Sequence, residues 1–496
     1  MSSVIDFLPA GWDTASIDEL VRIIDYRGRT PPYSQEGIPH LRSSNIRNFG
    51  VIWDGLKYVT EEIFQEYMTR GLPEEGDVLL TTEGPLGEVA LAPNIKFSLA
   101  QRMMLLRTDR HLLLPEYLMY QLANPEFQAR LKGHGTGTTV KGISARNFKP
   151  LKIYLSPLNE QHRIVAKIEA LTTRSRKARA ALDTIPPLLD QFRQSVLAAA
   201  FRGDLTADWR AQNPDVEPAE KLLERIRINR LPKASSSKQR EKISKIYDFQ
   251  EVGEVPDLPD SWRSTYLEKL AESLNYGTSA KSAPSGEVPV LRMGNLQGGE
   301  IDWDNLVYSS NEGEINKYSL KPYTVLFNRT NSPELVGKTS IYRGQRAAIF
   351  AGYLIRINNF EELDPEYLNY YLNSNYAKAM CWRVKTDGVS QSNINAQKLG
   401  KFEIPFCSLQ EQQKIVQKVD RYFACIRAIE KYYQDNHTNL NSLDQSILAK
   451  AFRGQLVTQD TNDEPASVLL ERIRAEREKI KKKTGKGGKG KGKRKR

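Results

Sequence analysis

SVLAAAFRG at residues 195–203 returns as SILAKAFRG at residues 446–454, and this repetition decides the fold. Further segments return at nearly the same offset: LPAGW (8–12) as LPDSW (258–262), PHLRSSNI (39–46) as PVLRMGNL (289–296), PEYL (115–118) as PEYL (365–368), LNEQ (158–161) as LQEQ (409–412), and EPAEKLLERIR (217–227) as EPASVLLERIR (464–474). Such agreement along the whole chain implies two head-to-tail copies of one structural unit.

Each copy begins with a segment of mixed character. Short β-type runs, such as 78–80 and 324–327, alternate with turns rich in Gly, Pro and Asn. We therefore predict an α/β fold class, with two compact α/β lobes separated by long helices. The predicted boundaries are a first lobe at 1–155, a first helical region at 156–230, a linker at 231–256, a second lobe at 257–406, a second helical region at 407–478, and a disordered basic tail at 479–496.

A heptad stripe of apolar residues follows each lobe. Its main members are Ile164, Ile168, Leu171, Leu182, Leu189 and Phe192 in the first copy, and Ile415, Val419, Tyr422, Ile426, Ile429, Leu440 and Leu443 in the second. Spacings of three and four residues are typical of a coiled-coil seam. The alternative is that each helix packs only on its own lobe. A stripe of about 44 residues would be about 66 Å long as a helix, which favours helices that cover each other.

Three seam positions are weak, namely Ser175, Ala178 and Asn436, and the last of these could fix the register. Pro186-Pro187 lies inside the first stripe, where a proline removes a backbone donor. We predict that the first long helix kinks or breaks near Asp183. The second copy has His437-Thr438 at that position and should continue without interruption.

The net charge of +12 is concentrated at one end of the chain. Residues 479–496 carry eleven Lys or Arg and no acid, which leaves the rest of the chain at +1. This tail is either a solvated segment or a non-specific DNA tether, so bulk charge alone does not establish DNA binding. The sequence has no apolar run of membrane-spanning length and no signal peptide, so we expect a cytoplasmic protein. Cys381, Cys407 and Cys425 are expected to be ordinary thiols, and the five scattered histidines predict no metal site.

The doubled plan resembles the specificity subunits of Type I restriction-modification systems. Its most specific marks are the helix starts at 157–161 and 408–412, and the helix ends at 195–203 and 446–454. The resemblance implies that each lobe is a target recognition domain reading one half of a split, asymmetric DNA site. It also implies an antiparallel coiled coil, with pseudo-two-fold symmetry, that spaces the lobes and docks two methyltransferase subunits. Restriction and translocase subunits complete that assembly, and S-adenosylmethionine, ATP and Mg belong to the partners, so this chain is expected to be non-catalytic.

Two short motifs suggest other functions. Residues 332–339 resemble a phosphate-binding P-loop, but Ser332 replaces its first glycine and Pro333 lacks an amide hydrogen. Residues 124–127 resemble a methyltransferase tetrapeptide, although a turn opening a helix explains them better. The remaining alternatives are a coiled-coil scaffold with non-specific DNA binding, and a methyltransferase or nuclease fused to its own reader. The sequence contains no convincing catalytic constellation for the latter.

Base edges are read by Arg, Lys, Asn and Gln on well-held loops. The candidates in lobe one are Arg27, Arg29, Arg42, Asn45, Lys132, Thr138 and Lys141. Those in lobe two are Lys281, Arg292, Asn295, Arg329, Asn331, Lys385 and Gln391. Arg42 with Asn45 and Arg292 with Asn295 occupy matched positions of the repeat. That match indicates either a shared reading role or a shared structural role.

Overall fold

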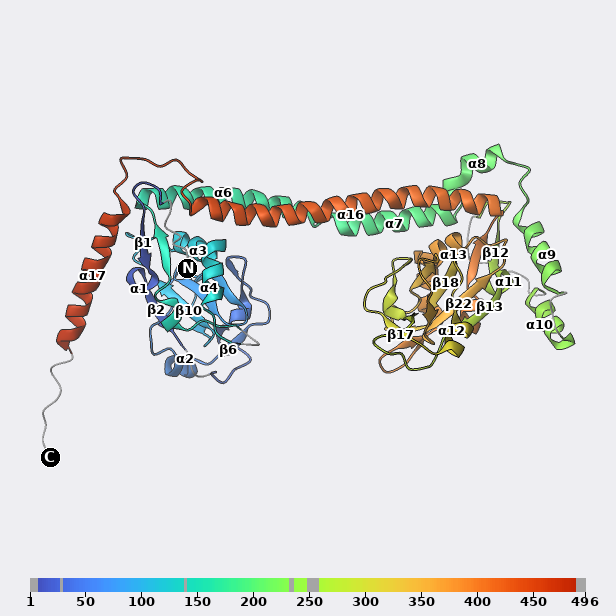
Figure 1. Ribbon diagram of the computed structural model, residues 1–496, viewed down its shortest axis with the longest axis horizontal. Helices are drawn as coiled ribbons and strands as arrows, with labels where there is room; N and C mark the ends of the chain where they lie inside the picture. The colour runs from blue at the N-terminus through green and yellow to red at the C-terminus, as the bar shows by residue number, and fades with distance from the viewer. Residues whose placement is uncertain (1–7, 27–29, 138–140, 232–235, 248–257, 488–496) are drawn as a thin grey trace, which may run out of the picture. The chain divides into compact units, whose positions relative to one another are not determined.

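The computed structural model describes all residues except 1–7, 27–29, 138–140, 232–235, 248–257 and 488–496. Its contacts divide the chain into two compact units (Figure 1). Unit 1 comprises Met1–Asp183 and Gln434–Arg496, and unit 2 comprises Thr184–Tyr433. Each unit therefore combines one lobe with helices from both copies of the repeat.

The main sheet of lobe one is antiparallel and has core on both faces. Its strand order is β2-β10-β7-β8. Alternate residues of β7 face opposite sides, so Val78 and Leu80 join one apolar cluster while Leu79 joins another. Helices α3 and α4 cover the first face, and a small sheet, β6-β3-β9, covers the second. The strands and helices are β2 (Arg22–Asp25), β10 (Met103–Arg107), β7 (Val78–Thr82), β8 (Leu86–Leu91), β6 (Lys57–Val59), β3 (Ile38–Leu41), β9 (Ser98–Leu99), α3 (Pro115–Ala123) and α4 (Pro125–Gly133).

Lobe two repeats this topology in the order β13-β22-β18-β20, with β17-β14-β21 as its small sheet. It adds a three-stranded sheet, β19-β24-β23. These elements are β13 (Ala271–Tyr276), β22 (Leu354–Asn359), β18 (Thr324–Asn328), β20 (Thr339–Tyr342), β17 (Val307–Ser309), β14 (Val288–Leu291), β21 (Ile349–Phe350), β19 (Thr330–Asn331), β24 (Ser392–Asn393), β23 (Thr386–Asp387), α13 (Pro365–Leu372) and α14 (Asn375–Val384). The tandem α/β repeat is confirmed, including the strands expected at 78–80 and 324–327.

Shorter elements complete both lobes. In lobe one they are β1 (Asp13–Ser16) paired with β11 (Lys152–Leu155), α1 (Ile17–Leu20), η1 (Ser43–Asn45), β4 (Ile46–Arg47), β5 (Gly50–Val51), α2 (Glu61–Tyr67) and α5 (Ala145–Phe148). Their counterparts in lobe two are β12 (Arg263–Tyr266) paired with β25 (Glu403–Phe406), α11 (Leu267–Leu270), η4 (Met293–Asn295), β15 (Leu296–Gln297), β16 (Glu300–Ile301), α12 (Glu312–Tyr318) and α15 (Ala396–Gly400).

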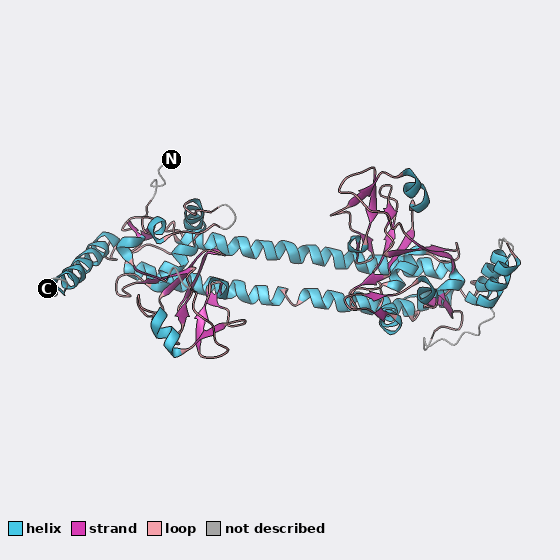
Figure 2. Cartoon of the chain, turned by 90° about the horizontal axis from the view of Figure 1, so that it is seen from below, coloured by secondary structure: helices cyan, strands magenta, loops and turns pink. Residues whose placement is uncertain are grey.

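The two long helical stretches differ as the prolines predict. The second is one helix, α16 (Leu409–Ala451), whereas the first breaks into α6 (Leu158–Leu182) and α7 (Ile185–Phe201), and the break is visible in Figure 2. The prolines occupy the first turn of α7, where no intrahelical donor is required. Within unit 1, α6 runs antiparallel to the C-terminal part of α16, and Arg179 is 3.1 Å from Asp444. Within unit 2, α7 runs antiparallel to the N-terminal part of α16, with Arg193 3.0 Å from Glu430.

The predicted seam is covered mainly near the helix ends. Ile164, Ile168, Leu189, Ile415, Val419 and Ile426 are buried, and Leu171, Leu182 and Leu440 are half-buried. Phe192, Tyr422, Ile429 and Leu443 are 41–48% exposed, which corrects the expectation of a continuously covered seam. A contact between only two helices shields one side of each seam residue. The long helices thus pack partly on each other and partly on their own lobes, because Ile164 and Ile168 also join the core of lobe one.

Three segments around the terminal helices differ from expectation or extend it. Helix α9 (Ala219–Arg230) follows η2 (Asp204–Thr206) and α8 (Ala207–Gln212). The expected linker contains helix α10 (Ser237–Tyr247), in which Ile243 is buried. The tail expected to be disordered from Lys479 is helical as far as Gly487, because α17 spans Ala466–Gly487. Extending a helix that is already anchored avoids the cost of nucleation, which a composition argument does not consider.

Candidate nucleic-acid interface

Each lobe is joined to its following helix by a buried Trp, Glu and Gln. The Trp12 indole donates to the Glu160 carboxylate at 2.9 Å, and the Trp262 indole donates to Glu411 at 2.9 Å. The side-chain oxygen of the next residue, Gln161 or Gln412, accepts a hydrogen bond from the backbone N–H just before α3 or α13. Its side-chain amide donates to the backbone carbonyl just after the last strand of the lobe. The repeated helix starts therefore fix the direction in which each helix leaves its lobe.

The repeated helix ends pack on the lobe of the other copy. The Phe201 ring meets the Tyr367 ring edge-on at 5.2 Å in unit 2, and Phe452 meets Tyr117 in the same way in unit 1. Gly203 has a φ of 82° and touches Pro259 so closely that a Cβ would lie 2.6 Å from it. The repeated motifs are thus structural, and they hold each lobe between helices of both copies.

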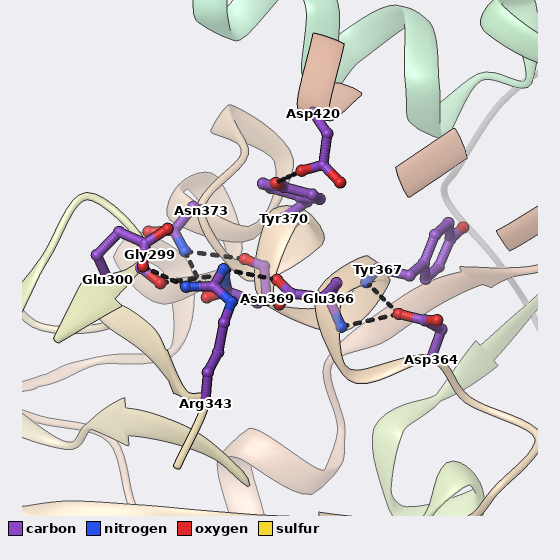
Figure 3. A network of polar contacts seen from close by, with 10 residues as sticks. All are labelled: Gly299, Glu300, Arg343, Asp364, Glu366, Tyr367, Asn369, Tyr370, Asn373 and Asp420. Atoms are coloured by element: carbon purple, nitrogen blue, oxygen red, sulfur yellow. Dashed lines mark hydrogen bonds and ion pairs between the residues drawn. The ribbon is translucent and has the colours of Figure 1, made fainter. Parts of the chain in front are cut away.

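A polar network braces lobe two beside its helix α13 (Figure 3). Arg343 donates to Glu366 at 2.9 Å and also contacts Glu300. The Tyr370 hydroxyl donates to Asp420 of α16, and burial raises the pKa of this tyrosine. These contacts tie helix α13 to strand β16, to the end of strand β20 and to helix α16.

The loops at one end of the strands of each main sheet carry most candidate residues. We call this end the loop edge, where β2 and β7 end and β10 begins in lobe one, and where β13 and β18 end and β22 begins in lobe two. In lobe two it comprises residues 277–287, 329–338, 351–353 and 385–394. Backbone hydrogen bonds join these loops, because Arg329 N donates to Tyr353 O and Ile394 N donates to Arg329 O.

Five lobe-two candidates lie in the loops of this edge, and four of them are in or next to the sheet β19-β24-β23. Arg329 stacks on the Tyr276 ring at 4.6 Å, and Asn331 lies beside it in β19. Lys385 is paired with Asp387, whereas Gln391 is exposed on the same hairpin. Lys281 is exposed in the neighbouring loop. The sheet β19-β24-β23 pairs Thr330 with Asn393 and Asn331 with Ser392, which are far apart in the sequence.

Asn45 and Asn295 are structural residues, which corrects their assignment as candidate base readers. Each is at most 3% exposed, and its side-chain oxygen accepts from the backbone N–H of Arg42 or Arg292. The Asn45 amide also donates to Ile52 O, as Asn295 does to Asp302 O. Both side chains are already engaged in holding a 3-10 turn. Their matched position therefore reflects shared structure.

The arginines of these two turns are also tied to backbone. Arg42 is half-buried and donates to Gly55 O at 3.0 Å, and Arg292 is exposed and donates to Asn305 O at 2.7 Å. In lobe one, Lys132 and Lys141 are exposed near the loop edge. The candidates Arg27, Arg29 and Thr138 lie outside the described residues.

Three exposed side chains at or next to the loop edges were not among the candidates predicted from the sequence. Arg102 lies at the start of β10, 3.5 Å from Glu83. Tyr353 and Trp382 are 53% and 59% exposed in lobe two, and Lys385 lies 4.3 Å from the Trp382 ring. Basic and aromatic side chains together suit contact with nucleic acid. No local pattern distinguishes these aromatic residues from core residues in the sequence.

The rival motifs have other structural roles. The segment resembling a P-loop leads into strand β20 rather than a helix, and Lys338 donates to Gln297 at 3.0 Å. Asn124 caps α4 by accepting from the Glu126 N–H, so this tetrapeptide opens a helix as expected. All three cysteines are free thiols, as predicted. Among the described residues, no helix is long and apolar enough to cross a membrane.

Comparisons with known proteins agree with this architecture. A family model described as the Type I restriction modification DNA specificity domain matches residues 9–182 and 259–435. This chain belongs to that family. It is 26% identical over 495 residues to the Type I restriction enzyme EcoKI specificity subunit of Escherichia coli K12, covering 95% of this chain and 96% of the relative. It is 25% identical to the StySPI specificity subunit of Salmonella potsdam, with the same coverage.

Two solved structures share the fold. One, described as the structural basis underlying complex assembly and conformational transition of the type I R-M system, is 20% identical, with a TM-score of 0.62 over 90% of this chain and 99% of that one. The other is the HsdS subunit of Thermoanaerobacter tengcongensis, also 20% identical, with a TM-score of 0.51 over 92% and 100% of the two chains.

Proposed function

We propose that this chain is a DNA-reading specificity subunit that binds a bipartite, asymmetric site in duplex DNA, one part with each lobe. The observation that carries the proposal is that two lobes of one topology present different side chains at matched loop edges. Arg329, Asn331 and Gln391 of lobe two have no identical counterparts in lobe one. Two frameworks with different reading residues suit two different half-sites, whereas identical lobes would suit a palindrome.

The chemistry of the loop edge favours reading over non-specific attraction. The chain without its tail has a charge near zero, so phosphate attraction alone would give weak binding. Amide and guanidinium groups on braced loops are the groups that discriminate base edges. This arrangement supports sequence recognition better than the alternative of a scaffold with non-specific DNA binding.

Catalysis belongs to partner subunits under this proposal. The helices of both copies dock two methyltransferase subunits, to which restriction subunits attach, and S-adenosylmethionine, ATP and Mg act in those partners. The purified chain alone should then neither methylate nor cleave DNA, and adding the methyltransferase subunits should produce methylation. Methyl transfer by the single chain would contradict this division of labour.

The test of reading is a substitution at one loop edge. Asn331→Ala and Gln391→Ala, assayed in the assembled methyltransferase, should relax recognition of the lobe-two half-site and leave the other half-site unchanged. Lys281→Ala, in a loop of the same edge that is not part of the sheet β19-β24-β23, is the comparison variant and should weaken binding without altering preference. A uniform loss of affinity for all sequences in the first two variants would favour the scaffold alternative.

A further inference from the structure

The hairpin of β23 and β24 in lobe two ends in an apolar side chain. Val389 is fully exposed, with a relative accessibility of 110%, and Ser390 beside it is also exposed. Gly388 N donates to Gln391 O at 2.8 Å and closes the turn, so the tip consists of these two residues. A single exposed valine is common on protein surfaces. This valine differs in that the hairpin carrying it is braced and nearly neutral.

The hairpin is braced on several sides. The Asn393 amide donates to the Thr330 hydroxyl at 2.7 Å, which joins β24 to β19. The Lys398 ammonium donates to the Thr386 hydroxyl at 2.7 Å from helix α15. A projection held this firmly loses little conformational freedom when it binds, and can therefore place one side chain accurately.

The hairpin is also nearly neutral. Lys385 at its base is 2.5 Å from Asp387, and the Ser392 hydroxyl donates to the same carboxylate. An element that follows the phosphate backbone uses free Lys or Arg. A neutral, apolar tip suits the interior of a groove instead. The apolar group that distinguishes base pairs in the major groove is the thymine 5-methyl, and a two-stranded ribbon fits in that groove.

We propose that Val389 contacts a thymine 5-methyl group in the major groove and thereby specifies one base pair of the lobe-two half-site. This inference rests on the proposed DNA-reading function. It adds a specificity residue of apolar type to the polar candidates. The matched loop of lobe one closes with a bridge between Thr136 and Gly142 and has a different sequence.

The test removes the methyl group from the DNA and the valine from the protein. The assembled methyltransferase is bound to duplexes in which each thymine of the target is replaced in turn by uracil. With the native chain, one position in the lobe-two half-site should lose roughly four-fold in affinity, as expected for one buried methyl group. Val389→Ala should bind the unmodified duplex about four-fold more weakly and be insensitive to uracil at that position.

Matched controls isolate the contact. Ser390→Ala, at the same tip, should retain the sensitivity to uracil, and replacements in the lobe-one half-site should affect native and Val389→Ala complexes equally. The proposal is overturned if no uracil replacement distinguishes the two complexes. It is also overturned if Val389→Ala alters only the response to inosine in place of guanine, which would place the tip in the minor groove. Loss of all sequence preference by the native complex would instead contradict the proposed function.

Discussion

The two equivalent buried carboxylates, Glu160 and Glu411, have different partners. Glu411 accepts from Trp262, from the Thr206 hydroxyl at 2.7 Å and from Arg210 at 2.6 Å. Glu160 accepts from Trp12 through one oxygen, and its other oxygen has no hydrogen-bond partner among the described residues. Burial raises the pKa of Glu160. The two copies of the repeat therefore share the hydrogen bond from tryptophan, but only in the second does an arginine also donate to the buried carboxylate.

Substituting each glutamate by glutamine should expose this difference. Glu160→Gln should keep the indole contact and leave the melting temperature unchanged or higher, because it removes the cost of burying a charge. Glu411→Gln should lower stability by about 1.5–3 kcal/mol, because Arg210 loses a charged partner. Since the folded-state pKa of Glu160 is raised, stability from this residue falls as pH rises through that pKa, and Glu160→Gln should remove that fall. Equal losses in both variants, measured by thermal unfolding, would refute this reasoning.

His40 should make lobe one less stable in acid. Its Nδ1 lies 2.8 Å from the Ser98 hydroxyl, and burial together with Arg42 lowers its pKa to about 4. The unfolded chain takes up this proton near pH 6.5 and the folded chain only near pH 4. Stability should therefore be complete above pH 6.5 and decrease by about 3 kcal/mol as pH falls to 4.

Lobe two supplies the control for this prediction. The same paired strand positions hold Val290 and Ile349 there, in matching register. The double variant His40→Val with Ser98→Ile should flatten the pH dependence of lobe-one unfolding between pH 6.5 and 4, as followed by hydrogen exchange of β3 and β9. A slope that remains unchanged in the double variant would assign the acid sensitivity to other groups.

At the level of elements, the prolines of the first copy explain why its long helix is broken while that of the second copy is continuous. Pro187 lies in the first turn of α7, and Thr438 lies inside the continuous helix α16. Thr438→Pro should destabilise the protein by about 3 kcal/mol or more, since it removes an interior hydrogen bond. Pro187→Ala should change stability by much less. Circular dichroism during urea unfolding distinguishes these outcomes, and a similar loss in both variants would show that the break is not set by proline chemistry.

The elements also show what the sequence could and could not predict. Repeats, strand runs and the Pro186-Pro187 break were readable, because each depends on local patterns. The exposure of Tyr422 and Leu443 could not be predicted, because a heptad pattern does not say which neighbour shields each position. The structural role of Asn45 and Asn295 could not be predicted either, because it depends on neighbours that the sequence does not reveal. The sequence marks them as polar and matched, but only the fold shows that their amides are used by backbone groups.

At the scale of the whole molecule, the basic tail tests how much binding is independent of sequence. Removing residues 479–496 should weaken non-specific DNA binding and flatten its salt dependence, while sequence preference stays intact. A log-log slope near −0.9 for each neutralised phosphate makes even a few lost contacts measurable. A full-length chain with the tail lysines replaced by glutamine controls for length. Unchanged affinity and slope would show that the tail is only a solvated segment.

Under the proposed function, the two lobes read DNA independently. Independent reading is tested most directly by exchanging residues 1–155 for the first lobe of a family member with a different target, then sequencing methylated adenines in cells that carry the hybrid with its methyltransferase subunits. One half-site should change to that of the donor, and the other half-site should be preserved. A hybrid that methylates a site with both halves rewritten would contradict it.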